Sequence, residues 1–242
     1  MTSIARHPLD AMIRKLGGAH RFSEAEQSAI KKLPISARTL SPQQDIVLEN
    51  GPSTQCCIIL DGWTCCYQSF EAGRRQISSL HVPGDLPDLQ SLHLPDPDFG
   101  MIALTQARVA FVPHANLHRL IERFPAIGTA LWREAQVSAA IQRSWLSSLG
   151  RRDARGRLAH LFCELYLRLE AVGLAGGDIS PMPLRQTDLA DALGLTPVHV
   201  NRTLKELRIA DLINLQTRKL EILDWPGLRA AGEFNPQYLH LK

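Results

Sequence analysis

The sequence predicts an α+β protein in which an antiparallel β domain is followed by a long helix and a C-terminal helical domain. From about residue 40 to residue 112, short apolar runs alternate with turn residues, a pattern typical of strands. Between residues 115 and 149 helix breakers are few and apolar residues recur at steps of three and four, which predicts a long helix. Near residue 190 the residue spacing predicts two helices joined by a tight turn. We therefore expect domains at 1–114, 115–149 and 150–242.

The composition is that of a folded protein with a mildly basic balance. Of the 242 residues, 45% are hydrophobic and 21% are charged, and the formal net charge of +3 permits a polyanionic partner without requiring one. No apolar run reaches the roughly 18 residues that a membrane helix needs, and the N-terminus lacks a signal-peptide pattern, so we expect a cytoplasmic protein without membrane contact. In that compartment the five cysteines stay reduced. They are Cys56, Cys57, Cys65, Cys66 and Cys163.

The predicted β domain follows a short helical N-terminus. Residues 1–38 are expected to form helices and loops, and Ser23 with Glu26 three positions later has the pattern of a capping box. The strand signals that follow include "CCIILDGWTCCYQSF" and "GMIALTQARVAFVP", in which apolar runs are bounded by turn residues. Their short and even spacing predicts a compact antiparallel sandwich or barrel.

The predicted long helix carries one apolar stripe, which Glu134 and Ser138 interrupt. Such a stripe either faces the core of its own chain or meets a second copy of the helix. Its apolar members are Ile127, Leu131, Ile141 and Trp145. A further helix follows in "GRLAHLFCELYLRL", and the segment "AGGDISPMP" after it is predicted to be a loop. The residues of this further helix that we expect to face inward are Leu158, Leu161, Phe162, Leu165 and Leu169.

Residues 186–213 meet the requirements of a helix-turn-helix one by one. Ala190 is small enough for the point where two helices cross, and Gly194 tolerates the positive φ angle of a tight turn. Thr196 can cap the second helix, and Pro197 suits its first turn because a missing N–H costs nothing there. The stripe expected to face inward consists of Leu189, Leu193, Val200, Leu204 and Leu207. Two packed helices that never touch DNA are the alternative.

Local charge favours a DNA-binding function for this segment. Between residues 195 and 220, five basic side chains stand against Glu206 and Asp211, a net of +3, although residues 151–242 as a whole are only slightly basic. The segment "LINLQTRKLEIL" then predicts a strand, a turn and a strand, with two basic residues at the tip of a wing. Together these features predict a winged helix-turn-helix. The alternative for each basic side chain is an ordinary solvated surface.

Three side chains of the second helix are candidates for reading base edges. Arg202 can bond a guanine edge through two donors, His199 can make one hydrogen bond, and Val198 can contact a thymine methyl group. Side chains further along the helix, at its start or on the wing are better placed for phosphate oxygens. The phosphate candidates are Thr187, Thr196, Asn201, Lys205, Arg208, Arg218 and Lys219.

The chain resembles the Crp/Fnr family of transcription regulators over nearly its whole length. The family's recognition segment is similar to "LADALGLTPVHVNRTLKELR", the helix after its dimerisation helix to "GRRDARGRLAHLFCEL", and turns of its sensory domain to "DGW" and "GRRQISSLHVPGD". The resemblance implies a jelly-roll-like β-roll related to cyclic-nucleotide-binding domains, a dimerisation helix in a parallel coiled coil, and a winged helix-turn-helix. It also implies a homodimer on double-stranded DNA, with RNA polymerase as a further partner.

A two-fold dimer would place its two recognition helices in successive major grooves, roughly 34 Å apart, on a palindromic site. The interface residues that the resemblance implies are Ile127, Leu131, Ile141 and Trp145. Many family members have an acidic residue near the start of the recognition helix that works with an arginine four positions later. Here Val198 stands at the acidic position and Arg202 is kept, so the preferred half-site can differ from the family's usual one.

The sensory domain lacks the residues with which family members bind cyclic AMP. Those members use a Gly-Glu pair and, further along, an arginine that holds the cyclic phosphate; here Asp88-Leu89 and Phe99 stand at these positions. Without a cation to neutralise the phosphate, we expect no cyclic AMP binding in the usual mode. Aspartates near this segment would repel the phosphate further, and they are Asp85, Asp88, Asp96 and Asp98.

Metal sensing is not expected either. Iron–sulfur members of the family carry a cysteine cluster near the N-terminus, whereas the first cysteine here is Cys56. In "CCIILDGWTCC" neighbouring cysteines point to opposite faces of a strand, so buried thiols are expected rather than a complete metal site. His114 and His118 have the spacing of a helical metal pair without an evident third ligand, and core or surface histidines are expected. Haem, which needs one or two axial ligands, stays open, and the effector is unassigned.

The sequence thus predicts a sequence-specific DNA-binding transcription regulator that acts as a homodimer. A second class of function is a ligand sensor that acts through protein contacts and uses the helix-turn-helix as an interaction surface; it predicts weak, salt-sensitive binding to every DNA sequence. An enzyme is not expected, because the sequence has no nucleophile elbow, P-loop, dinucleotide-binding glycine pattern or metal-ligand motif.

Overall fold

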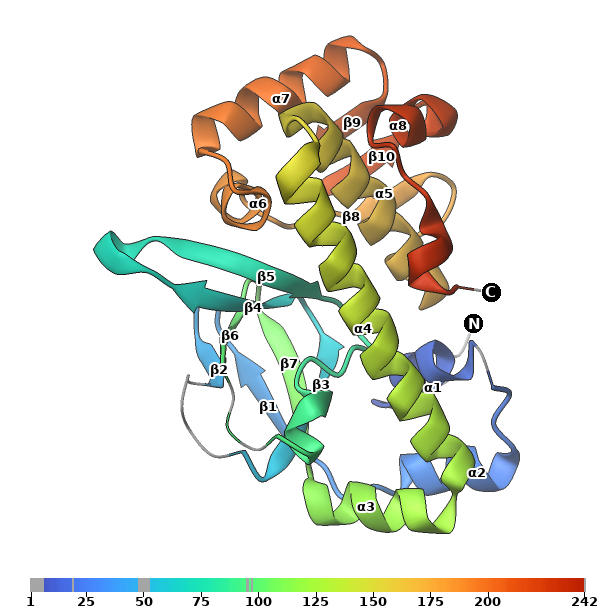
Figure 1. The fold of residues 1–242 in the computed structure, drawn as a ribbon. Coiled ribbons are helices and arrows are strands. Elements are labelled where there is room, and N and C mark those ends of the chain that lie inside the picture. Colours follow the sequence, from blue (N-terminus) through green and yellow to red (C-terminus); the bar gives the residue numbers. More distant parts are fainter. Residues whose placement is uncertain (1–6, 19, 48–52, 95, 97, 242) are drawn as a thin grey trace. The chain divides into compact units, whose positions relative to one another are not determined.

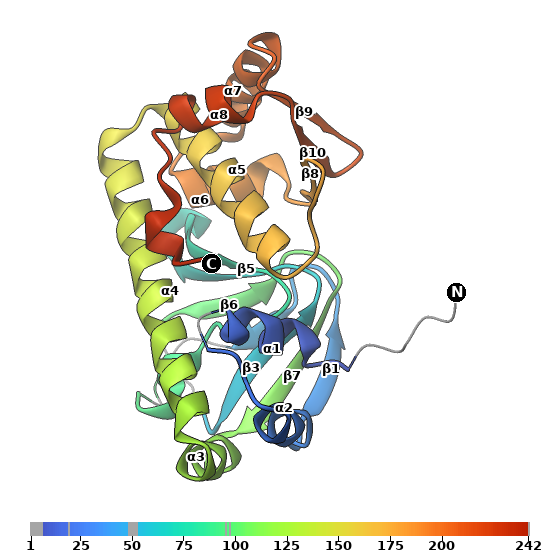
Figure 2. The ribbon, with the colours of Figure 1, turned by 90° about the vertical axis from the view of Figure 1, so that its right-hand side faces the viewer.

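The computed structural model describes residues 7–18, 20–47, 53–94, 96 and 98–241 (Figure 1). Internal contacts divide the chain into two compact units. The first contains the chain up to Thr64 together with His81–Gln136, and the second contains Cys65–Leu80 together with Val137–Leu241. Antiparallel strands dominate the early part of the chain and helices the later part, which confirms the α+β class (Figures 1 and 2). The domain boundaries expected from the sequence stay a prediction.

Antiparallel strands form the β domain that the alternation of apolar runs and turns predicts, and they begin slightly earlier than expected, at Ser36. The strands are β1 (Ser36–Leu40), β2 (Asp45–Val47), β3 (Gln55–Asp61), β4 (Thr64–Ser69), β5 (Arg75–His81), β6 (Gly100–Ala103) and β7 (Ala107–Pro113). One sheet has the order β1-β7-β3 and another the order β2-β6-β4-β5. In the first sheet Leu40 pairs with Ala107 and Ile58 with Ala110, so β7 is the central strand.

Short helices of the first unit share a hydrophobic core with strands β3 and β7. They are α1 (Asp10–Gly17), α2 (Glu24–Lys31) and α3 (His114–Arg123), with short 3-10 turns η1 (Glu71–Gly73) and η2 (Leu89–Leu92) between strands. The predicted capping box is confirmed, because Ser23 and Glu26 bond each other's backbone N–H groups at the start of α2. Lys15 of α1 forms ion pairs with Asp85, at 2.6 Å, and with Glu134. Both carboxylates are buried, so these pairs hold α1 and Glu134 to the turn after β5.

The long helix α4 (Pro125–Arg151) is separated from α3 by Phe124. Its apolar stripe lies inside the chain's own units. Ile127 and Leu131 are buried in the core of the first unit, and Trp145 is buried in the second. Glu134 interrupts the stripe in the sequence, and its ion pair with Lys15 explains why a carboxylate is tolerated at a buried position. The side chains that the sequence assigned to a dimer interface are therefore largely occupied by intramolecular packing.

The second unit contains the predicted helix-turn-helix and its wing. Its elements after α4 are α5 (Ala154–Ala171), β8 (Ile179–Pro181), α6 (Gln186–Leu193), α7 (Pro197–Ile209), β9 (Ile213–Gln216), β10 (Lys219–Ile222), α8 (Trp225–Ala231) and η3 (Pro236–Leu239). The five residues of α5 that were expected to face inward are buried, as predicted. The prediction of a loop at 175–183 was wrong in part, because β8 pairs with β10 and completes a sheet of order β8-β10-β9. Three residues are too few to show a strand period in the sequence.

A buried polar network holds α5 against its neighbours in the second unit. Glu164 is fully buried, and its carboxylate accepts hydrogen bonds from Trp145 Nε1 at 3.0 Å and from the Tyr238 hydroxyl at 2.8 Å. The Arg168 guanidinium lies 3.1 Å from the same carboxylate and donates to the carbonyl of Leu80 at the end of β5. This network joins α4, α5, β5 and the C-terminal turn η3 through one charged centre.

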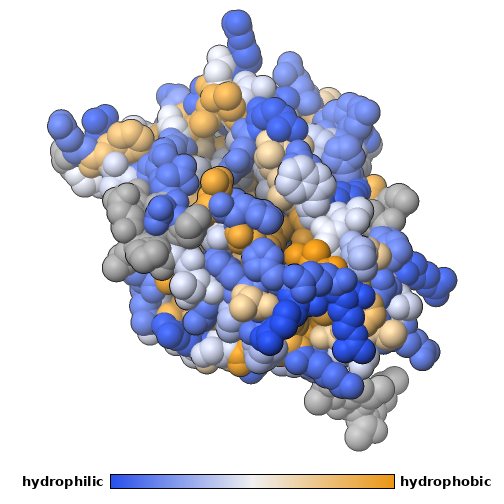
Figure 3. All heavy atoms as spheres, turned by 60° about the horizontal axis from the view of Figure 1, so that its bottom comes forward, coloured by the Kyte–Doolittle hydropathy of each residue, from blue (hydrophilic) through white to orange (hydrophobic). Residues whose placement is uncertain are grey.

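Hydrophilic residues predominate on the face of the molecule shown in Figure 3, with small patches of apolar residues between them. None of the helices in the described part of the chain is long and apolar enough to span a bilayer.

Candidate nucleic-acid interface

The helix-turn-helix turn forms as the sequence predicts. Gly194 ends α6 with a φ of 63°, a left-handed conformation in which its N–H bonds the carbonyl of Ala190. Three residues later Pro197 begins α7, and the Thr196 hydroxyl accepts a hydrogen bond from the N–H of His199 at 3.2 Å. Capping at both ends of so short a connection fixes the direction in which α7 leaves the turn.

The inward stripe of the two helices is confirmed by burial. Val200, Leu204 and Leu207 of α7 are buried, as are Leu189, Ala190 and Leu193 of α6. Thr203 is also buried, and its hydroxyl donates back to the carbonyl of His199, so this buried polar side chain is satisfied. The opposite face of α7 is therefore the one available to a partner.

The outward face of α7 carries the candidate base-reading side chains. Val198 is 81% exposed, Arg202 and Lys205 are exposed, and His199 is half-buried beside them. The described part of the chain leaves most of the Val198 side chain uncovered, which fits contact with an apolar group such as a thymine methyl. Of the phosphate candidates, Thr187, Thr196, Asn201 and Arg208 are also exposed. Views from two sides place α7 at the outer edge of its unit (Figures 1 and 2).

The wing presents its two basic residues at a strained turn. Strands β9 and β10 pair Gln216 with Lys219, so Thr217 and Arg218 form a two-residue hairpin turn. Their φ angles are 48° and 61°, in the left-handed region that such turns require and that Asn-Gly usually supplies. A non-glycine residue there costs about 1 kcal/mol or more. Since Arg218 and Lys219 are exposed, a cationic side chain at the tip is a reason to tolerate that strain.

Replacing Arg218 by glycine is expected to stabilise the fold by about 0.5–1 kcal/mol, because glycine adopts positive φ without strain. If Arg218 contacts a phosphate, the same change is expected to weaken DNA binding about three- to tenfold and to lower the salt dependence of the affinity. Chemical denaturation and fluorescence anisotropy measure the two effects. Arg218→Lys is the matched control, since it keeps both the strain and the charge. A glycine variant that gains stability without losing affinity would contradict a role of the wing tip in DNA binding.

Comparisons with known proteins agree with this geometry. Residues 156–231 match the family model described as "Crp-like helix-turn-helix domain", and residues 37–124 match the one described as "Cyclic nucleotide-binding domain". The chain is 29% identical over 191 residues to the nitrogen fixation regulation protein FixK of Bradyrhizobium diazoefficiens, covering 78% of this chain and 76% of that protein. It is 24% identical over 225 residues to the anaerobic regulatory protein of Haemophilus influenzae, covering 93% and 87% of the two chains.

The chain belongs to the Crp/Fnr family. The solved structure of FixK2 from Bradyrhizobium japonicum has the same fold, with a TM-score of 0.74 at 23% identity, covering 82% of this chain and 98% of that one. The resemblance stated from the sequence is thereby confirmed, as is the arrangement of a β-roll, a long helix and a winged helix-turn-helix. Crp/Fnr proteins are DNA-binding transcription regulators, and the interface described above is the part of this member that fits that activity.

This Crp/Fnr protein has buried side chains at the two positions that the resemblance assigns to a cyclic nucleotide. At the first of these positions Asp88 is buried; its Oδ1 accepts a hydrogen bond from the N–H of Cys57 at 2.8 Å, and its Oδ2 has no partner among the described residues. At the second position the apolar side chain of Phe99 is buried. A buried carboxyl with an unsatisfied oxygen and a phenyl ring offer nothing that neutralises a phosphate.

The other aspartates near this segment divide into two kinds. Asp85 is buried in its ion pair with Lys15, so it supports the fold and does not face a ligand. Asp96 and Asp98 are exposed. Of the four aspartates that were expected to repel a phosphate, it is therefore mainly the exposed Asp96 and Asp98 that could do so.

Burial raises the pKa of Asp88 to about 7, and the hydrogen bond from Cys57 only partly opposes that rise. In the unfolded chain the group has an ordinary pKa near 3.8. Its stabilising contribution is therefore complete below the unfolded pKa and is lost as the pH rises through the folded value. Between pH 5 and pH 8 the wild type is expected to lose about 2–3 kcal/mol of unfolding free energy relative to Asp88→Asn.

Chemical denaturation of the wild type and of Asp88→Asn across that pH range measures this difference. Groups that titrate in both proteins contribute equally and drop out of the difference. The exposed Asp96→Asn serves as the control and is expected to follow the wild type. Parallel stability curves for the wild type and Asp88→Asn would show that Asp88 keeps an ordinary pKa in the fold.

Cys56, His114 and His118 have partners within the fold. Cys56 Sγ lies 3.5 Å from the Ser91 hydroxyl, which lies 2.9 Å from His114 Nε2, and burial raises the pKa of the Cys56 thiol to about 12. The ring of His118 packs edge-on against that of His93. All five cysteines are buried thiols, and in the described part of the chain no group of three or more His, Cys, Asp or Glu side chains could hold a metal ion.

Two charged residues near the interface have partners that the sequence did not indicate; Arg185 was not a candidate, and Glu206 entered only the local charge balance. Arg185 lies at the start of α6, and its guanidinium bonds the buried Asp188 at 2.9 and 3.1 Å, while Asp188 also caps the helix. Glu206 lies one turn after Arg202, with 3.8 Å between its carboxylate and Arg202 Nε. The spacings of three and four residues were visible in the sequence, but they became informative only once the buried face of each helix was known.

Proposed function

We propose that this Crp/Fnr protein is a sequence-specific transcription regulator that acts as a homodimer on palindromic promoter sites in the cytoplasm. The observation that carries the proposal is the exposed face of α7, where Val198, His199 and Arg202 lie together on a helix that is capped and buried on its other side. Arg202 would read a guanine edge, His199 would add one hydrogen bond, and Val198 would contact a thymine methyl group.

The phosphate contacts of the proposed complex come from both sides of the recognition helix. Exposed Lys205 and Arg208 follow the base-reading residues on α7, Thr187 lies at the start of α6, and the wing tip adds Arg218 and Lys219. Thr196 and Asn201 add polar groups at the start of α7. Such contacts hold the helix in register without carrying sequence information.

The dimer proposal rests on the face of α4 that the core leaves open. Trp132 and Leu146 are 66% and 72% exposed, and they lie two heptads apart on this helix. Residues at that spacing share one side of a coiled-coil helix, and large exposed apolar side chains mark a surface that another protein covers. We therefore assign the interface to this face, in place of Ile127, Leu131 and Trp145. Ile141, which is half-buried, lies two heptads after Ile127 and therefore belongs to the other stripe.

A charge in the proposed interface is expected to dissociate the dimer. Leu146→Glu would place a carboxylate in an apolar seam and shift the protein from dimer to monomer in analytical ultracentrifugation. Ser147→Glu is the matched control, because Ser147 is also exposed but lies about 100° away around the helix. A Leu146→Glu variant that stays dimeric while folded would contradict the assignment of this face.

We further propose that the β-roll senses something other than cyclic AMP and that the DNA-bound dimer contacts RNA polymerase. The absence of a phosphate-neutralising cation at Asp88 and Phe99 supports the first statement, and membership of a family of transcription regulators supports the second. We propose no catalytic activity and no membrane partner.

Selection of DNA from random duplexes by the purified full chain tests the main proposal. Enrichment of a two-fold symmetric sequence is the expected result. Weak, salt-labile retention of all sequences alike would instead support a sensor that acts through protein contacts.

A further inference from the structure

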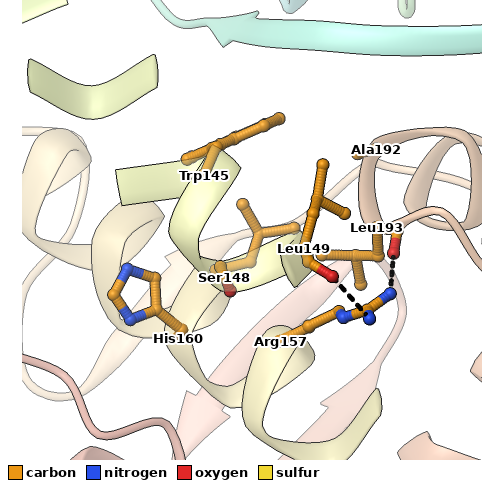
Figure 4. A pocket seen from close by; sticks show the side chains of 8 residues that line it. Trp145, Ser148, Leu149, Arg157, His160, Ala192 and Leu193 are labelled. Atoms are coloured by element: carbon orange, nitrogen blue, oxygen red, sulfur yellow. Dashed lines mark hydrogen bonds between the residues drawn. The ribbon is translucent and has the colours of Figure 1, made fainter. Parts of the chain in front are cut away.

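Three helix ends of the second unit meet at the side chain of Arg157, in the first turn of α5. Its Nε donates to the carbonyl of Arg152 at 2.9 Å, and one terminal nitrogen donates to the carbonyl of Leu149 at 2.8 Å. The other terminal nitrogen donates to the carbonyl of Leu193 at 2.9 Å (Figure 4). One guanidinium thus serves the end of α4, the α4–α5 connection and the end of α6.

The accepting carbonyls are those that helices leave without partners. Leu149 lies in the last turn of α4, and Leu193 is the last residue of α6. Carbonyls at a helix C-terminus lack an intrahelical donor, and a cation is favoured there by the helix dipole. A cavity of about 10 Å³ beside Arg157, lined also by Trp145, Ser148 and Ala192, has room for about one water molecule. Few water molecules can therefore reach these carbonyls and replace Arg157 as their hydrogen-bond donor.

Arginine is suited to this place by its shape. A guanidinium presents its donors in a rigid planar fork, so two acceptors on different helices are held at a defined separation and direction. A lysine ammonium is a single point donor on a flexible stem and cannot span the same carbonyls at once. The hydrogen bonds of Arg157 therefore constrain the angle between α4 and α6 as well as the distance between them.

The angle matters because α6 leads directly into the recognition helix. Gly194 follows Leu193, where a Cβ atom would contact Leu149 and Arg157, and α7 begins at Pro197. The capped turn leaves little freedom between α6 and α7. The two carbonyls that Arg157 joins therefore contribute to the direction of α7 relative to the end of α4.

We propose that Arg157 is a positioning residue that determines the spacing of the two DNA half-sites. The inference rests on the proposed homodimer, in which the α4 helices of the two subunits pack against each other around the two-fold axis. In such a dimer, the angle between α4 and α7 within each subunit determines the distance and the rotation between the two recognition helices. Half-sites one base pair further apart are displaced by about 3.4 Å and turned by roughly 35°, so a rigid joint selects one spacing.

Binding to a series of palindromes that differ only in spacer length tests the inference. The half-sites come from the DNA selection described above, and the spacer varies in steps of one base pair. The wild-type dimer is expected to prefer one spacer about tenfold over its neighbours, a discrimination comparable to that of one base pair in a half-site. Arg157→Gln is expected to reduce this preference below about threefold while keeping the affinity for the best spacer within about tenfold.

Two further variants separate positioning from simple destabilisation. Arg157→Lys keeps the charge and the aliphatic stem but loses the fork, so it is expected to flatten the spacer preference as well and is the one to measure if Arg157→Gln does not fold. Arg155→Gln removes an exposed arginine two residues earlier and is expected to behave as the wild type. A thermal unfolding transition above the assay temperature shows for each variant that the binding data come from folded protein.

Spacer preference unchanged in folded Arg157→Lys or Arg157→Gln would overturn the inference. A wild-type protein that enriches no palindrome would instead overturn the proposed function, so the two failures are distinguishable. A loss of affinity that is equal for all spacers would assign Arg157 a purely structural role and would also count against the inference.

Discussion

Arg202→Ala is expected to lower the affinity for the selected palindrome by about 1–3 kcal/mol per half-site, tenfold or more, and to remove the base preference at one position of each half-site. Arg202 is exposed on the outward face of α7, and its Nε lies near Glu206, which leaves the two terminal nitrogens free to bond a guanine edge. Binding measured on the palindrome and on each single-base variant of it gives both quantities.

Lys205→Ala is the matched control for this prediction, because Lys205 lies on the same exposed face but further along the helix. A phosphate contact carries no sequence information, so its loss weakens all sequences alike and reduces the salt dependence by about one counterion per half-site. If Arg202→Ala weakened all sequences equally, as is expected for Lys205→Ala, Arg202 would be a phosphate contact and the base-reading assignment would be wrong.

The largest effect on stability is expected at Glu164, where replacement by alanine would lower the free energy of unfolding by about 3–5 kcal/mol. Burial raises the pKa of this carboxyl, while Arg168, Tyr238 and Trp145 oppose the rise by favouring the charged form. Alanine would remove the acceptor of two hydrogen bonds and a charge partner of the buried Arg168 guanidinium. Buried donors that lose their acceptor lower the free energy of unfolding, because no water molecule takes the acceptor's place.

Denaturant unfolding of Glu164→Ala beside Glu170→Ala measures this cost. Glu170 lies on the same helix, is exposed, and accepts a long hydrogen bond of 3.3 Å from Tyr166, so its removal is expected to change stability by less than about 1 kcal/mol. Equal effects of the two substitutions would show that the network around Glu164 contributes little net stability.

The sequence by itself determined the parts of the interface that depend on neighbouring residues. Gly194, Thr196 and Pro197 specify their turn through backbone preferences, and Ser23 with Glu26 specifies a cap in the same way. The burial of Val200 and its stripe followed from helical period alone. These requirements are met within a few residues, so they are visible without knowing the rest of the fold.

The exposed face of α4 was decided only by tertiary structure. Periodicity identified an apolar stripe through Ile127 and Trp145, but it could not tell whether the chain or a second copy would cover it. The units of the chain itself bury that stripe, and the exposed Trp132 and Leu146 lie on another face. The physical reason is that a helix with apolar residues on two faces has no internal signal of which one its own core takes.

The same holds for Glu164, Arg157 and the short strand β8. A charged residue is expected at the surface by its type, and only the convergence of α4, α5 and η3 supplies the partners that allow Glu164 to be buried. Arg157 gains its role from carbonyls that are 36 and 8 residues away in the chain. Contacts between distant segments depend on how elements pack in three dimensions, and a single sequence records the residues without recording which of them meet.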